Sequence, residues 1–238
     1  MTMDEQYLQW RKEIERFFAP KNKLLDSRQV ELSPSGNFQI EIHRYSTGPT
    51  SWNFSRGIIT QVADGKIIAD VKRNYGHFWY AWVTHPNGKE YLLCGEDYQG
   101  QSLVNLTTGT YQIYFPESGY KGAGFCWAAV YPSPDSLMLA VDGCYWAYPY
   151  DLVFYDFHEP ENLPYRELLR IEGLDGCEGW IDNEIFALKR EIRMRKSDGA
   201  LYDLLTDEEQ EILANDESLV EYRYELIHCK RPSIPAND

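Results

Sequence analysis

The sequence lacks the short motifs that mark the common enzyme classes. None of the patterns G-x-S-x-G, H-E-x-x-H, G-x-G-x-x-G and G-x-x-x-x-G-K-[S/T] occurs in its 238 residues. Each of these patterns places a catalytic nucleophile, a pair of zinc ligands or a phosphate-binding loop. Their absence removes the usual sequence anchors for a hydrolase, a zinc protease, a dinucleotide enzyme or a P-loop NTPase.

Positive charge is also scarce. The chain holds 23 Lys and Arg against 37 Asp and Glu, which gives a formal net charge of −14. Nucleic acid is a poor partner, because its phosphates must be neutralised by basic side chains and no cluster of Lys or Arg in this acidic sequence offers a stripe that could do so. The acidic balance favours a basic protein partner or a neutral ligand, or it serves solubility alone.

Zinc-type cysteine pairs and long apolar segments are both missing. No C-x-x-C pair and no run of about 18 uncharged apolar residues occurs, and residues 1–18 are charged where a signal peptide would be apolar. The sequence therefore predicts a cytoplasmic protein with no membrane partner, no metal and no cofactor. An odd number of irregularly spaced cysteines predicts reduced, mostly buried thiols; these are Cys94, Cys126, Cys144, Cys177 and Cys229.

The N-terminal segment has the pattern of an amphipathic helix over residues 1–20. Thr2 and Glu5 have the spacing of a capping box, and Pro20 ends the pattern. We expect the helix to cover a sheet of its own chain. Its apolar face consists of Tyr7, Trp10, Ile14, Phe17 and Phe18.

From residue 29 the pattern changes to short strands separated by turns. Aromatic residues make up 15% of the chain, and they alternate with polar residues between Gly and Pro, as is typical of strands. Ser33-Pro34-Ser35-Gly36 predicts a turn between two strands, and Asp64-Gly65 predicts a second hairpin. We therefore expect one β-rich domain over residues 29–229 and a flexible tail over residues 230–238.

Two stretches repeat the same plan at an offset of 48 residues. Trp79 corresponds to Trp127, Pro86 to Pro134, and Gly95 to Gly143. A weaker unit begins at residue 176, where GCEGWIDNEIFALKREIRMR lacks the proline. Sheets of four short strands repeated every 40 to 50 residues or so bury their faces by stacking on their neighbours, as propeller blades do.

Two segments carry a family resemblance. SPSGNFQIEI and YPSPDSLMLAV resemble blades of TolB-type and WD-type β-propellers over about residues 30–195. The segments GFCWAAVYPSPD and DGCYWAYPY also resemble an uncharacterised bacterial family. The resemblance implies a mainly β fold, namely a small propeller-like stack of antiparallel sheets that is about four-bladed or incomplete.

The C-terminal part adds a helix and a strand. Thr206 and Glu209 form a second capping box, which predicts a short acidic helix ending near Asn215. SLVEYRYELIHCKR then alternates apolar and polar residues, which predicts a late strand. We expect this strand to pair with the first sheet and close the structure.

Three loops between strands carry aromatic residues, and stacked units would bring these loops to one end. They are STGPTSWNF, GEDYQGQ and GCYWAYPYD. Aromatic side chains with few charges are common in protein-binding hot spots and in sugar sites. The predicted binding residues are Trp52, Glu96, Asp97, Tyr98, Asp142, Tyr145, Trp146, Tyr148 and Tyr150.

Three functions remain open from the sequence. The first is a protein-binding module that uses these loops, with a basic partner such as a toxin as a special case. The second is an enzyme or a binder of a small, sugar-like ligand with Glu96, Asp97 and Asp142 as acid–base candidates. In the third, the aromatic loops only pack on one another and the domain has no site of its own.

Overall fold

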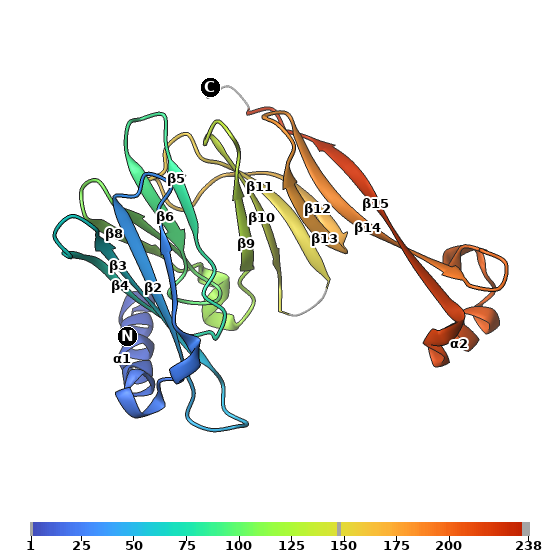
Figure 1. Ribbon diagram of the computed structural model, residues 1–238, viewed down its shortest axis with the longest axis horizontal. Helices are drawn as coiled ribbons and strands as arrows, with labels where there is room; N and C mark the ends of the chain where they lie inside the picture. Colours follow the sequence, from blue (N-terminus) through green and yellow to red (C-terminus); the bar gives the residue numbers. More distant parts are fainter. Residues whose placement is uncertain (1, 147–148, 235–238) are drawn as a thin grey trace.

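The computed structural model describes residues 2–146 and 149–234, which form four antiparallel sheets lying side by side (Figure 1). Sheet A contains β1 (Gln29–Leu32), β2 (Phe38–Tyr45), β3 (Phe54–Gln61) and β4 (Ile67–Arg73). Sheet B contains β5 (Ala81–Thr84), β6 (Glu90–Cys94), β7 (Gln101–Asn105) and β8 (Thr110–Tyr114). Sheet C contains β9 (Cys126–Pro132), β10 (Met138–Cys144), β11 (Tyr150–Asp156) and β12 (Glu167–Leu174). Sheet D contains β13 (Gly176–Trp180), β14 (Ile185–Arg195) and β15 (Val220–Lys230).

The sheets form an open, propeller-like stack. Within each sheet the strands follow one another in chain order, as in a propeller blade. Sheets A and D lie at opposite ends of the stack, and the sheets do not close into a ring (Figure 1). The expected mainly β, incomplete propeller-like fold is therefore confirmed.

The repeated turns of sheets A, B and C share one backbone hydrogen bond, in which the fourth residue donates to the carbonyl oxygen of the first at 2.8, 3.0 and 2.7 Å. The backbone N–H of Phe38 donates to Oγ of Ser33 at 3.1 Å, and that of Met138 donates to Oγ of Ser133 at 3.0 Å. In sheet B, His85 replaces the serine, and its Nδ1 accepts from the backbone N–H of Asn87 at 3.2 Å. Each turn thus satisfies a backbone donor with a side chain from the first turn position.

Three apolar cores hold the sheets together, one between each pair of neighbours. Ile40, Ile59 and Val71 of sheet A pack in one core with Leu92 and Val104 of sheet B. The core between sheets B and C includes Tyr91, Leu93, Leu139 and Val141. The core between sheets C and D includes Met138, Ala140, Phe154, Phe186 and Leu188.

The two tryptophans matched by the repeat occupy one core. Trp79 is 4% exposed, Trp127 is 2% exposed, and their ring centroids are 5.7 Å apart between sheets B and C. Each residue precedes its turn by the same number of residues and faces the other across the stack. Packing therefore accounts for both tryptophans.

The N-terminal helix α1 (Met3–Ile14) has the expected capping box and packs on its own chain. A 3₁₀ turn, Glu15–Phe18, follows it. The Phe17 ring stacks on Phe54 with centroids 4.4 Å apart, and the Tyr7 ring stacks on Phe115 with centroids 4.7 Å apart. The helix thus fastens the ends of sheets A and B together (Figure 1).

The C-terminal strand corrects one expectation. β15 pairs with β14 over its whole length, from Val220 opposite Arg195 to Lys230 opposite Ile185. It therefore lies in sheet D and does not close the structure on sheet A. The far end of this hairpin projects from the stack and carries α2 (Asp207–Asn215), whose capping box joins Thr206 and Glu209 (Figure 1). We call the segment from Met194 to Tyr224 the arm.

The remaining features of the fold are the state of the cysteines and the length of the helices. All five cysteines are free thiols, and two of them, Cys94 and Cys144, are buried. Within the described residues, no helix has the length and apolar character needed to span a membrane.

Candidate functional site

One aromatic side chain from each of three sheets meets at one end of the stack. Trp52 lies between β2 and β3, Tyr98 between β6 and β7, and Trp146 between β10 and β11. The ring centroids of Trp52 and Trp146 are 6.4 Å apart with an interplanar angle of 13°, and those of Tyr98 and Trp146 are 5.5 Å apart. We call these three residues the aromatic mouth.

The mouth exposes large apolar rings and holds one of them in a strained backbone. Trp52 is 47% exposed and Trp146 is 59% exposed. Trp146 has φ of 90°, which a residue with a side chain rarely adopts and which costs on the order of 1–3 kcal/mol. Trp52 is fixed because its Nε1–H donates to the carbonyl oxygen of Asn74 at 2.7 Å. Strain and exposure together mark the mouth as a candidate binding surface.

A pocket of about 540 Å³ opens beneath the mouth. It extends between the ends of sheets A, B and C down to Trp127 of the core. Its volume lies in the range of small-molecule and side-chain pockets. The lining side chains are Trp52, Arg73, Tyr75, His77, Tyr98, Cys126, Trp127, Ala128, Cys144, Trp146 and Tyr150.

Arg73 is the charged residue that lines this pocket. It is 2% exposed, and its Nε donates to the carbonyl oxygen of His77 at 2.8 Å. Its Nη1 donates to the carbonyl oxygens of Gly95 at 2.6 Å and Asp97 at 3.0 Å. Burial lowers the pKa of Arg73 to about 10, although the nearby Asp97 carboxylate opposes this shift. The guanidinium is therefore a buried cation held by main-chain oxygens.

Three other polar groups of the pocket, His77, Cys126 and Tyr150, have pKa values shifted by burial toward their neutral forms. Burial, and next the charge of Arg73, lower the pKa of His77, so this ring is uncharged near neutral pH. Burial raises the pKa of Cys126 to about 11, which keeps its thiol protonated and poorly nucleophilic. Burial also raises the pKa of Tyr150. These groups can donate or accept hydrogen bonds, but they do not form an activated nucleophile.

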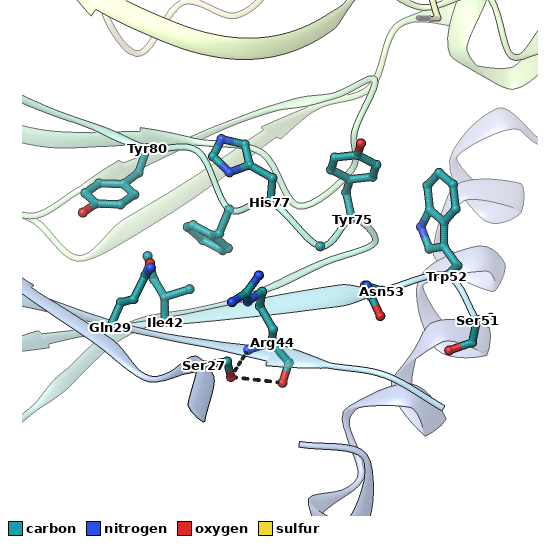
Figure 2. Close-up of a pocket in the computed structure, with 12 residues that line it drawn as sticks. Ser27, Gln29, Ile42, Arg44, Ser51, Trp52, Asn53, Tyr75, His77 and Tyr80 are labelled. Carbon is teal, nitrogen blue, oxygen red and sulfur yellow. Dashed lines mark hydrogen bonds between the residues drawn. The ribbon is translucent and has the colours of Figure 1, made fainter. Parts of the chain in front are cut away.

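A second hollow, of about 650 Å³, adjoins the first and shares Trp52, Tyr75 and His77 with it. Figure 2 shows the side chain of Arg44 extending from β2 toward the segment that carries Tyr75 and His77. The backbone of Arg44 is held by Ser27, whose Oγ accepts from its N–H at 2.9 Å. The two hollows therefore lie next to each other beside the mouth.

Glu96 does not line the pocket beneath the mouth. Its carboxylate accepts from the hydroxyl groups of Tyr7 at 2.6 Å and Tyr111 at 3.0 Å. Arg11 Nε lies 3.4 Å from the same carboxylate. Glu96 is therefore occupied beneath α1, because two tyrosines and one arginine satisfy its oxygens.

Asp97 is likewise turned away from the pocket. Its Oδ2 accepts from the side-chain amide of Asn74, and its Oδ1 accepts from the backbone N–H of Gln99 at 2.9 Å. Burial raises the pKa of this carboxyl group. Asp97 thus fixes the loop that presents Tyr98, and it does not face a ligand in the pocket.

The four remaining predicted residues differ in their position relative to the pocket. Asp142 follows the side of β10 that carries Met138 and Ala140, so it faces sheet D and does not line the pocket. Tyr145 packs on Phe125 with centroids 5.2 Å apart, outside the pocket lining. Tyr148 lies outside the described residues, whereas Tyr150 lines the pocket.

Sequence reasoning missed the two arginines, although strand alternation carried a signal for both. Ala69 and Val71 of β4 face the core, and Arg73 continues their side of the strand. Arg44 follows Ile42 on the inward side of β2 in the same way. A basic residue at the end of an inward-facing series indicates a charged group at the edge of the core.

Within the described residues, no group of three or more His, Cys, Asp or Glu side chains is placed to hold a metal ion. The carboxylates that the sequence suggested for acid–base chemistry also do not converge. Glu96 lies under α1, Asp97 faces Asn74, and Asp142 faces sheet D. None of these three carboxylates lines the pocket beneath the mouth.

Comparison with known proteins identifies one relative. The chain is 36% identical over 206 residues to "Uncharacterized protein R762" of Acanthamoeba polyphaga mimivirus, covering 81% of this chain and 78% of that protein. The chain belongs to the family of this viral protein. The relative is viral, so it lends no support to a bacterial origin, and no family model matches the sequence.

Among solved structures, the chain is similar to the β-propeller domain of Cps50 (Swd1) from Myceliophteria thermophila. The TM-score is 0.41 at 13% identity, over 67% of this chain. The match spans about half of the Cps50 chain, 48% of its length. The description of the fold as propeller-like rests on its own sheets and cores.

Proposed function

We propose that this protein is a protein-interaction module that binds a segment of its partner at the aromatic mouth and the pocket beneath it. The observation that carries the proposal is the meeting of Trp52, Tyr98 and Trp146, which come from three different sheets. Contiguous exposed apolar rings are uncommon on a monomer and mark contact surfaces. Trp and Tyr are also enriched among residues that dominate binding energy.

The pocket supports a partner that inserts a side chain or a short segment. Its walls are the exposed rings of Trp52 and Trp146, and its floor includes the core residue Trp127. Rings that are already ordered lose little conformational entropy when they bind. The mouth therefore offers a preformed surface.

The basic partner expected from the net charge is a separate, finer proposal. The net charge of −14 would attract a basic protein at long range. The mouth itself gives that idea little support, because Glu96 and Asp97 are occupied by Tyr7, Tyr111 and Asn74. A basic partner would bind better at the arm, where α2 begins with Asp207, Glu208 and Glu209.

The proposal is tested by affinity capture from the source cells with the tagged full chain. We expect a stoichiometric partner protein whose capture is lost with Trp146→Ala, because the change removes the central ring of the mouth. Tyr224→Ala is the matched control, since Tyr224 is 55% exposed but lies on the arm. Equal capture by Trp146→Ala and the parent would contradict the mouth as the contact surface.

A further inference from the structure

The two hollows at the mouth share an electrostatic property that the rest of the molecule does not suggest. Each is lined by one charged side chain, Arg73 in the first and Arg44 in the second. Neither lining contains Asp, Glu or Lys. A chain with a net charge of −14 thus places one arginine in each of the two hollows beside the mouth.

Arg73 has an unused donor. Its three hydrogen bonds involve Nε and Nη1, and among the described residues Nη2 has no partner. None of its acceptors is a carboxylate, although the guanidinium is 2% exposed. Burial of a charge is costly unless an opposite charge compensates it. The nearby Asp97 carboxylate compensates part of this cost without forming an ion pair with Arg73 among the described residues, and an anion in the pocket would supply a direct partner.

The residues around Arg73 leave room for its guanidinium group. Gly95 lies against the guanidinium, and a Cβ at Gly95 would be 2.7 Å from Nη1. Any other residue there would push the guanidinium away from the carbonyl oxygens that orient it. Arg73 is therefore a buried cation at the edge of the core, and the absence of a side chain at Gly95 provides the space for it.

Arg44 is a second, independent cation on the same surface. It is exposed, and among the described residues it has no ion pair. Figure 2 shows it on the opposite side of the hollow from Tyr75 and His77, which also line the Arg73 pocket. The two arginines thus flank one short segment of chain.

We propose that the aromatic mouth selects an acidic segment of its partner, with one anionic side chain bound by Arg73 and a second by Arg44. This inference rests on the proposed function and names the chemistry of the partner. Guanidinium groups bind carboxylate and phosphate oxygens through paired N–H donors. The anionic groups are therefore Asp or Glu side chains, or phosphorylated residues.

The test uses short peptides without tryptophan, so that the fluorescence of Trp52 and Trp146 reports binding to the full chain. The probes are Ac-Phe-Glu-Phe-NH2, its Gln and Lys counterparts, the phosphoserine counterpart, and inorganic phosphate. We expect the Glu or phosphoserine peptide to bind at least about tenfold more tightly than the Gln peptide, as a charge-assisted hydrogen bond requires. The tighter of the two identifies the source of the anion.

Substitutions of the two arginines test which side chain provides the preference for the anionic peptide. Arg73→Gln should reduce the preference for Glu over Gln by about tenfold or more, and Arg73→Lys should retain part of it. If loss of the carbonyl contacts unfolds Arg73→Gln, Arg44→Gln keeps the inference testable, because Arg44 is exposed. For Arg44, the probe is Ac-Glu-Phe-Glu-NH2. The second carboxylate of this peptide should increase its affinity for the parent but not for Arg44→Gln. Arg166→Gln is the matched control outside both hollows.

The outcomes separate this inference from the proposed function. If all peptides bind equally and Trp146→Ala weakens all of them, the mouth is a binding surface but it does not select anions. If inorganic phosphate binds as tightly as the peptides, or if no anionic peptide binds at millimolar concentration, the acidic-segment inference is overturned. If the Lys peptide binds best, the partner is basic and the inference is wrong.

Discussion

Sheets C and D follow the same strand order, but only sheet C is enclosed. Sheet C has sheet B on one face and sheet D on the other, and Leu139, Val141 and Phe154 are 0% exposed. Sheet D has a neighbour on one face only. In β15, Tyr224 is 55% exposed and Leu226 is 62% exposed. Alternation of apolar residues therefore predicts a strand, whereas burial depends on whether a neighbouring sheet is present.

The two sheets also differ in completeness. Sheets A, B and C have four strands each, whereas sheet D has three and ends at the long edge strand β15. Charged residues interrupt the exposed apolar side chains of this edge, including Arg223 and Glu225. Charges on an edge strand oppose pairing with other chains.

The largest test of this contrast is a pair of leucine truncations. Leu139→Ala should lower the free energy of unfolding by about 2–5 kcal/mol, because it leaves a cavity in the core between sheets B and C. Leu226→Ala should change it by about 0.5 kcal/mol or less, because the side chain is already in solvent. Urea unfolding of both variants measures the difference. Equal losses would mean that β15 is covered in solution.

The interface between sheets C and D should also respond to pH. Burial raises the pKa of Asp142 to about 6, and its Oδ1 has no hydrogen-bond partner among the described residues. Because the folded-state pKa exceeds the unfolded one, the native protein holds the proton more strongly. The resulting stability is complete below about pH 4 and is lost as the pH rises through about 6.

Asp142→Asn removes this dependence. We expect it to raise the free energy of unfolding at pH 7.5 by about 1 kcal/mol, a value reduced for partial solvent access, and to have little effect at pH 4. Glu172→Gln, an exposed change on the same sheet, should have no pH-dependent effect. Urea melts from pH 4 to 8 measure both variants. A variant that is less stable than the parent at pH 7.5 would show that the carboxylate has a partner in solution.

The smallest expected effect concerns the arm. Residues 196–219 make contacts within the arm, such as Arg195 Nη1 to Glu209 at 2.7 Å and the Tyr202 hydroxyl to the carbonyl oxygen of Gln210 at 3.2 Å. Replacing residues 196–219 with an Asn-Gly turn should therefore change the free energy of unfolding by less than about 1 kcal/mol. Thermal and urea unfolding of the shortened chain test this. A loss of several kcal/mol would show that the arm belongs to the cooperative unit of the stack.

The sequence predicted those parts of the fold that depend on local patterns. Prolines and glycines fixed the turns, and the spacing from Trp79 to Trp127 gave the repeat. Because equal repeats place equivalent loops at the same end, the meeting of Trp52, Tyr98 and Trp146 also followed. The positions of the other candidate residues depend on contacts between distant parts of the chain, which leave no local pattern in the sequence.

Three features show where sequence reasoning ended. Tyr7 and Glu96 are 89 residues apart, and no pattern indicates that this tyrosine would engage that carboxylate. β15 pairs across the arm with β14, although its composition fits an edge in any sheet. Strand alternation could have predicted that Arg73 faces inward, but a basic residue at a strand end is normally assumed to face solvent.

The position of α1 has a consequence for synthesis of the chain. This helix is synthesised before its partners Glu96 and Phe115, which lie about a hundred residues later. At translation rates of about 5–20 residues per second, the rings of Tyr7 and Trp10 wait about 5–20 seconds before sheet B can receive them. During that interval the nascent chain presents an amphipathic helix to chaperones near the ribosome, and docking of the helix marks completion of the first two sheets.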